Sequence, residues 1–166
     1  MEEHTGNTEG KTQAVETIKE LIDGIGTCVI ATHTADGGIV TRPMGVQDKD
    51  FDGDLWFMTS RDSDLVEQIT ANDQVNVTFV GKGTWVSLRG RAELVEDPQR
   101  KEELASALTG AFLQTDPKSP EAALIQVNTE AGEYWSSEGA KTVLEIIKAR
   151  VTGDRPDAGQ NDTVQL

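Results

Sequence analysis

Residues 39–60, IVTRPMGVQDKDFDGDLWFMTS, decide the fold because they contain two strand-like segments around an acidic turn. The first segment holds Pro43, which has no N–H group and cannot serve the middle of a sheet ladder. Pro43 therefore indicates an edge strand, a bulge, or a place where something other than a neighbouring strand lies alongside. The adjacent Arg42 carries a fixed charge that can bind a phosphate through two parallel hydrogen bonds. The second segment ends in two hydroxyls and another guanidinium, Thr59-Ser60-Arg61, so the pair of strands predicts a ligand site.

The flanking sequence continues the strand pattern. TCVIATHT (27–34) and residues 39–47 are separated by a Gly-rich turn, which predicts a hairpin. Two later segments, 74–80 and 84–96, each place apolar residues on one face. Gly90 in the middle of the second segment indicates a bend or a close backbone approach. Residues 123–137 predict a last strand or a bent strand pair.

Helical patterns lie between and around these strands. Apolar residues of segment 13–23 fall on one helical face, and Gly24 and Gly26 end that helix. A short helix follows the second strand of the opening stretch, with Asp62 or Ser63 as its cap. Asp97-Pro98 predicts a helix start, with the helix running to about Leu108. A loop-like segment is expected at 109–120, before the last strand. A closing helix is expected over 138–150, after that strand.

Five or six antiparallel strands with short turns favour a mainly β, α+β fold, a small closed or split β-barrel with flanking helices. The strands do not alternate with helices as a doubly wound sheet requires. We expect one domain over residues 13–150. Polar composition predicts a flexible N-terminus at 1–12 and a flexible tail at 151–166.

Composition limits the partners. The 166-residue chain has a formal net charge of −14, which argues against nucleic acid or an anionic membrane surface as a partner. No apolar run approaches a membrane span, and the N-terminus lacks the basic and apolar regions of a signal peptide. The single cysteine, Cys28, cannot form an internal disulfide, so a cytoplasmic location is expected.

Side-chain catalysis has little support in the sequence. Segment 24–26 lacks the third glycine of a dinucleotide loop, and segment 81–84 leads into a strand, so a helix stop and a hairpin turn are the better interpretations. Cys28 lies among apolar residues and is interpreted as an inert core thiol. The two histidines, His4 and His33, have no evident metal-ligand companions. These observations favour a borrowed cofactor.

Five segments resemble the general stress protein family of the pyridoxamine 5'-phosphate oxidase-like, FMN-binding split-barrel superfamily. The resemblance covers about residues 13–150 in the same element order. It implies a homodimer with one FMN in each of two clefts at the subunit interface. The segments are Thr41–Met44, FDGDLWFMTSRDS (51–63), VNVTFV (75–80), WVSLRGRAELVED (85–97) and EYW (133–135).

The resemblance also implies roles for individual residues. Arg42 and Met44 would lie along the flavin, and Pro43 would relieve the strand of a ladder bond. Thr59 and Ser60 would meet the ribityl-phosphate part, and Ser63 would stand at a helix N-terminus that favours an anion. Trp135 matches a tryptophan that approaches the flavin in the family. The alternatives are that Arg42 is a surface charge, that the hydroxyls only end a strand, and that Trp135 serves core or dimer packing.

The chain departs from the family at one position. Many relatives carry a phosphate-neutralising lysine two residues after the serine that matches Ser63, and this chain has Leu65 there, preceded by Asp64. The sequence suggests Arg61 as a compensating cation, and otherwise weaker flavin binding, another cofactor, or its loss. The expected function is that of a flavin-dependent oxidoreductase acting in stress response. The alternatives are a non-catalytic flavin-binding or flavin-sensing stress protein, or a relative that uses deazaflavin or haem.

Overall fold

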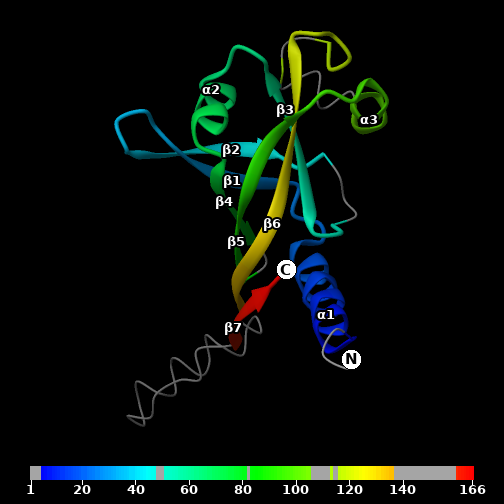
Figure 1. Cartoon of the computed structure of the whole chain (residues 1–166). Coiled ribbons are helices and arrows are strands. Elements are labelled where there is room, and N and C mark those ends of the chain that lie inside the picture. The colour runs from blue at the N-terminus through cyan, green and yellow to red at the C-terminus, as the bar shows by residue number, and fades with distance from the viewer. Residues whose placement is uncertain (1–4, 48–50, 82, 106–112, 114–115, 137–159) are drawn as a thin grey trace.

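The computed structural model describes residues 5–47, 51–81, 83–105, 113, 116–136 and 160–166. The described part forms one sheet of seven antiparallel strands with three helices around it (Figure 1). The helices are α1 (Thr5–Ile22), α2 (Asp64–Ala71) and α3 (Pro98–Leu104). The strands are β1 (Thr27–His33), β2 (Ile39–Gly45), β3 (Asp54–Ser60), β4 (Gln74–Gly81), β5 (Thr84–Val95), β6 (Ala122–Ser136) and β7 (Gln160–Gln165).

The sheet curls into a split barrel. The strand order is β2-β1-β4-β5-β6-β3, with β7 beside the second half of β6. β2 and β3 therefore end the order, and their edges approach where the Gln47 N–H donates to the Trp56 carbonyl at 3.1 Å. The mainly β, split-barrel prediction is confirmed. Pro43 lies on edge strand β2, one of the positions that its missing N–H group permits.

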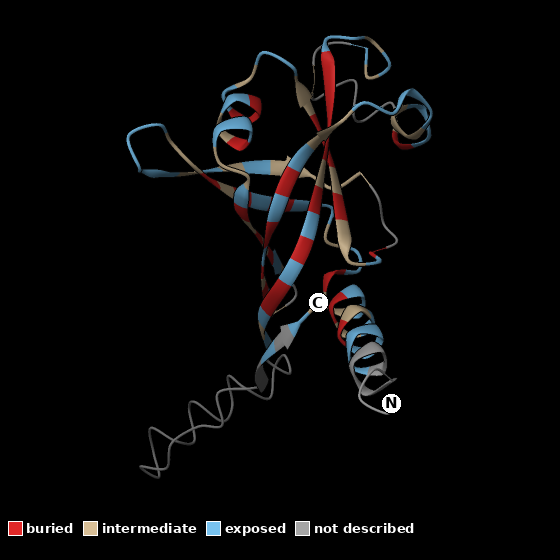
Figure 2. Ribbon diagram, viewed as in Figure 1, coloured by how far each residue is buried: buried red, intermediate tan, exposed pale blue. Residues whose placement is uncertain are grey.

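Alternation of apolar and polar residues explains the core. The residues of β4 and β5 that share a face in the sequence, including Val77, Phe79, Val86 and Leu88, are almost completely buried. Figure 2 shows the resulting bands of buried and exposed residues along β5 and β6. The register between β5 and β6 shifts at Arg89/Gly90. A Cβ at Gly90 would lie 2.3 Å from the Asn128 carbonyl oxygen, so the predicted close backbone approach is confirmed.

The helix boundaries follow the predicted signals in most places. Ser63 caps α2, with its side chain accepting from the Val66 N–H, and Asp97 caps α3 before Pro98. Ile22 ends α1, and Gly24 follows with φ of 74°, a left-handed conformation that glycine adopts without strain. None of the described helices is long and apolar enough to cross a membrane.

Three segments differ from the expectation. Helix α1 begins at Thr5 rather than at 13, because a nucleated helix gains one hydrogen bond for each residue added. Helix α3 ends at Leu104, before the predicted Leu108. The polar tail contains β7, which pairs with β6 and satisfies backbone groups of that edge. The predicted helix at 138–150 and most of the predicted loop at 109–120 lie outside the described residues.

Candidate functional site

Arg42 joins three elements through a network of neutral groups. Its Nη1 donates to Thr32 Oγ1 on β1 at 3.1 Å, and its Nη2 donates to Gln68 Oε1 on α2 at 2.7 Å. The Thr32 hydroxyl in turn donates to the same Gln68 oxygen at 2.6 Å. Arg42 is half-buried, and Thr32 is only 1% exposed. The guanidinium is thus held on the inner face of the edge hairpin.

The charge of Arg42 is not neutralised within the part of the chain that the structure describes. No carboxylate there lies within salt-bridge distance of it, although the chain has a net charge of −14. A guanidinium has five N–H donors, and the two contacts use two of them. Three other described arginines do pair with carboxylates: Arg61 with Glu96, Arg91 with Asp73 and Glu130, and Arg100 with Glu103.

A second group of polar side chains lies at the start of α2. The Thr59 hydroxyl, at the end of β3, donates to Ser63 Oγ at 3.3 Å. Gln68 lies five positions after Ser63, which is about 7.5 Å along an α-helix. Because α2 contacts both β1 and β3, it connects the two sides of the split in the barrel. We name Thr32, Arg42, Thr59, Ser63 and Gln68 the seam cluster.

The described residues around the start of α2 supply no second cation for a phosphate. Asp62 and Asp64 are exposed beside the α2 N-terminus. Leu65, where the family resemblance implies a lysine, is 2% exposed and packs in the main core. The seam cluster therefore offers one guanidinium, hydroxyls and an amide, a donor set that fits a single phosphorylated ligand with only one charge contact.

The structure places two of the predicted site residues, Ser60 and Arg61, in contacts outside this cluster. The Ser60 hydroxyl donates to Asp62, within the turn that follows β3. Arg61 binds Glu96 through Nη1 at 2.6 Å and Nη2 at 3.2 Å, and its Nε donates to the Pro120 carbonyl. The Glu96 hydrogen bond raises the pKa of Arg61 and lowers that of Glu96. Arg61 is thus already paired, outside the seam cluster.

The remaining predicted residues divide between the two faces of the sheet. Met44 packs against the main core, and Pro43 is exposed on the outer face opposite Val29. Trp135 pairs in register with Trp85, and both side chains are exposed on the outer face. Arg42 belongs to the inner face with Thr32. One chain therefore does not bring Trp135 to its own seam cluster.

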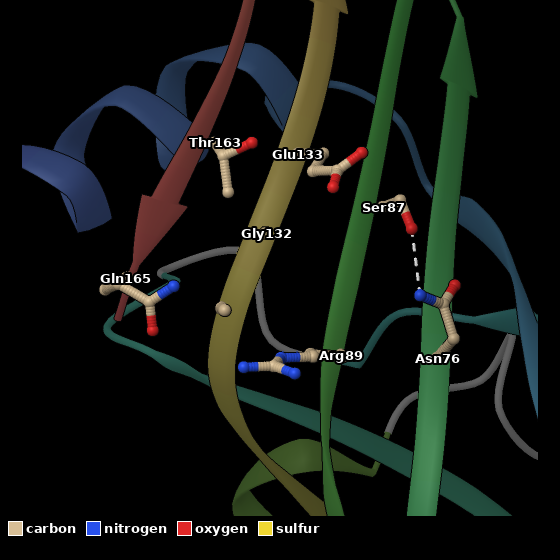
Figure 3. A pocket seen from close by; sticks show the side chains of 8 residues that line it. Asn76, Ser87, Arg89, Gly132, Glu133, Thr163 and Gln165 are labelled. Carbon is tan, nitrogen blue, oxygen red and sulfur yellow. Dashed lines mark hydrogen bonds between the residues drawn. The ribbon is translucent and has the colours of Figure 1, made fainter.

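The outer face has a polar hollow of about 390 Å³ (Figure 3). Its lining pair Ser87 and Glu133 lies two positions along β5 and β6 from the pair of tryptophans. Arg89 of β5 and Glu133 of β6 line it, and neither has an ion-pair partner among the described residues. The Asn76 amide donates to Ser87 Oγ at 2.8 Å at its margin. Val80 lies beside Trp85 and is 55% exposed, so an apolar row borders the hollow.

Cys28 is a core residue, as the sequence predicts. It is 2% exposed, and burial raises the pKa of its thiol to about 12. The thiolate is the reactive form, so the folded protein should show negligible reaction with a disulfide reagent at pH 8. One equivalent should react after denaturation. A full equivalent titrated rapidly under native conditions would contradict this assignment.

Four residues of the seam cluster and the hollow were not predicted from the sequence: Thr32, Gln68, Arg89 and Glu133. Thr32 carried a faint signal, a hydroxyl at a buried position of a strand otherwise lined by Cys28 and Ile30. Gln68 carried none, because a glutamine on a short helix is an ordinary surface residue. Arg89 and Glu133 become neighbours of one hollow only through the pairing of β5 with β6.

Comparison with known proteins places this geometry in a family. The family described as pyridoxamine 5'-phosphate oxidase like matches residues 13–157. No protein of curated function matches the chain in sequence.

Solved structures share the fold over most of the chain. A candidate general stress protein 26 from Jannaschia sp. CCS1 has a TM-score of 0.73 and 23% identity, covering 93% of this chain and 99% of its own. General stress protein 26 from Bacillus anthracis str. Sterne has a TM-score of 0.64 and 25% identity, with 74% and 93% coverage. The general stress FMN/FAD binding protein from Xanthomonas citri has a TM-score of 0.65 and 23% identity, with 77% and 92% coverage.

Proposed function

The chain belongs to the pyridoxamine 5'-phosphate oxidase-like family, and on this premise we propose that it binds FMN and acts as a flavin-dependent oxidoreductase. The observation that carries the proposal is Arg42, a half-buried guanidinium without a carboxylate partner among the described residues of a strongly anionic chain. An anionic ligand would neutralise it. A solved neighbour of the same fold is described as FMN/FAD binding, which supports a flavin.

The residues of the seam cluster would bind and orient the cofactor. Arg42 would hold the phosphate through its remaining N–H donors, and Thr59 and Ser63 would supply hydroxyls. The N-terminus of α2 would add a favourable dipole for the anion. When bound, the flavin supplies hydride or electron transfer, while the protein supplies binding, orientation and water exclusion. Stress response is the cellular role that the family resemblance suggests.

A non-catalytic flavin-binding protein is the second candidate. The side chains of the seam cluster are a guanidinium, three hydroxyls and an amide, none of which is a usual general acid or base. The Cys28 thiol is buried and unreactive. A flavin carrier or sensor needs no acid or base. The composition of the seam cluster therefore supports such a protein, and it does not support an enzyme whose side chains transfer protons.

The visible spectrum of freshly purified protein tests these candidates, together with identification of the released cofactor by mass spectrometry. A flavin spectrum that is bleached by NADH or NADPH supports the oxidoreductase. A flavin spectrum that neither donor bleaches, while a control reductase turns over, supports the non-catalytic protein. If a deazaflavin or haem is released, that group replaces FMN as the proposed cofactor. Colourless protein that binds no added FMN would contradict both candidates.

The partner in this proposal is a second copy of the chain, docked through the outer face. Val80, Trp85 and Trp135 give this face an exposed apolar row across one end of β4, β5 and β6, and aromatic residues often anchor interfaces. In a two-fold dimer the same patch serves both subunits. Arg89 of one copy would then meet Glu133 of the other, and the two tryptophan pairs would be buried against each other.

Charge reversal tests this interface. Arg89→Glu and Glu133→Arg should each weaken the dimer by about tenfold or more, because each creates two like-charge contacts across the two-fold axis. The double variant Arg89→Glu/Glu133→Arg should recover most of the affinity. Sedimentation equilibrium gives the dimerisation constants. A monomeric wild type, or single variants as dimeric as the wild type, would contradict the proposed interface.

A further inference from the structure

We propose that Gln68 is a positioning residue whose neutral amide fixes the Arg42 guanidinium while leaving its charge available to the phosphate of a flavin. This proposal rests on the proposed function. It assigns to Gln68 the orientation of Arg42 rather than direct contact with the phosphate. The seam cluster holds one cation, Arg42, in a chain of net charge −14. A charged partner would cancel that cation, so it matters that Thr32 and Gln68 are neutral.

The geometry makes Gln68 the acceptor that joins the network. Gln68 Oε1 accepts from Arg42 Nη2 at 2.7 Å and from Thr32 Oγ1 at 2.6 Å. Thr32 Oγ1 accepts from Arg42 Nη1 at 3.1 Å, which closes a three-membered ring of hydrogen bonds. Thr32 is 1% exposed on β1, so the ring is anchored in the core. The two contacts made by Arg42, to Thr32 and to Gln68, fix the direction of the guanidinium.

The neutrality of the amide preserves the attraction for an anion. A carboxylate at this position would form an ion pair with Arg42, as Glu96 does with Arg61 at 2.6 Å. Such a pair has no net charge to offer a phosphate, and the free carboxylate oxygen would repel it. The amide accepts the same hydrogen bond without that cost. Gln68 therefore orients Arg42 as a carboxylate would, but leaves the positive charge uncompensated.

Helix α2 links the two halves of the seam cluster through this contact. Ser63 caps the helix beside Thr59, and Gln68 contacts Arg42 about 7.5 Å further along the axis. Leu65, Val66 and Ile69 bury one face of the same helix. The packing of α2 thus fixes the spacing between the hydroxyl pair and the guanidinium.

The isosteric variant Gln68→Glu tests the inference. It keeps the shape of the side chain and adds an ion pair with Arg42, so the fold should be retained. The measured quantity is phosphate discrimination, the ratio of the riboflavin dissociation constant to the FMN dissociation constant. We expect this ratio to fall about tenfold or more in Gln68→Glu, the effect of losing a charge-assisted contact. The exposed control Gln13→Glu on α1 adds the same charge and should leave the ratio unchanged.

A second probe does not depend on flavin binding. Inorganic phosphate should raise the thermal unfolding midpoint of the wild type and Gln13→Glu more than that of Gln68→Glu, because a ligand stabilises the state that binds it. If Gln68→Glu does not fold, Gln68→Leu replaces it in both measurements. Gln68→Leu leaves Arg42 charged but untethered, and its discrimination should fall about threefold.

Each outcome decides the inference. If Gln68→Glu keeps the wild-type ratio of riboflavin to FMN dissociation constants, the positioning role is overturned and the proposed function stands. A purely structural role would lower the unfolding midpoint of the variant and leave the ratio unchanged, which also overturns it. If the wild type binds no flavin, the proposed function fails. The shift of the unfolding midpoint by inorganic phosphate then decides the role of Gln68. A phosphate response lost in Gln68→Glu supports the inference, and equal responses in both proteins overturn it.

Discussion

Replacing Leu65 with lysine is expected to destabilise the protein rather than to supply the phosphate-binding cation that the family resemblance implies at this position. Leu65 is 2% exposed and packs in the main core beneath α2. An ammonium there loses its hydration without gaining a partner, in addition to the lost packing of leucine. The free energy of unfolding should fall by about 3–5 kcal/mol, measured by urea denaturation.

The neighbouring Asp64 provides the matched substitution. Asp64 is exposed in the first turn of α2, so Asp64→Lys introduces the same ammonium without burying it. The lost carboxylate at the helix N-terminus should cost about 0.3–1 kcal/mol of stability. FMN binding should tighten by about three- to tenfold at low ionic strength and less in high salt. Leu65→Lys as stable as the wild type would show that α2 is not packed as described.

Arg42→Ala is expected to weaken FMN binding by about 1.5–3 kcal/mol, which is about ten- to a hundredfold in the dissociation constant. The structure gives the reason, because Arg42 is held by Thr32 and Gln68 and has three N–H donors left for the phosphate. Fluorescence quenching of the flavin on titration with protein measures the constant.

The control for Arg42→Ala is Arg91→Ala. Arg91 is an exposed arginine paired with Asp73 and Glu130, so its removal changes the net charge of the chain by the same amount. Its effect on FMN affinity should be less than about twofold, because exposed charges at a distance are screened by salt. An unchanged dissociation constant in Arg42→Ala, or an equal loss in both variants, would remove Arg42 from the phosphate site.

Much of the fold is predictable because its signals are local. The proline in β2, the Ser63 cap and the glycine at the β5–β6 close approach each impose a backbone constraint that the sequence displays directly. Strand β7 escaped prediction because QNDTVQ (160–165) lacks an apolar pattern, and its pairing with β6 depends on a distant edge. The polar first part of α1 escaped for the same reason.

The site was less predictable than the fold. Arg42 was visible as a cation beside a strand-breaking proline, but its partners come from β1 and α2, which meet only when the sheet curls. The sequence suggested Arg61 as a compensating cation, yet it pairs with Glu96 because β3 ends beside the segment after β5. The orientation of Trp135 toward the outer face depends on the register of β6 with β5.

The measurement that tests the central claim most directly is a parallel titration of the wild-type protein with FMN and with riboflavin. The two ligands differ only in the phosphate, and the claim is that Arg42 holds that phosphate. We expect FMN to bind about tenfold more tightly or better, the worth of at least one hydrogen bond to a charged group. Equal dissociation constants for the two ligands, or no binding of either, would contradict the account.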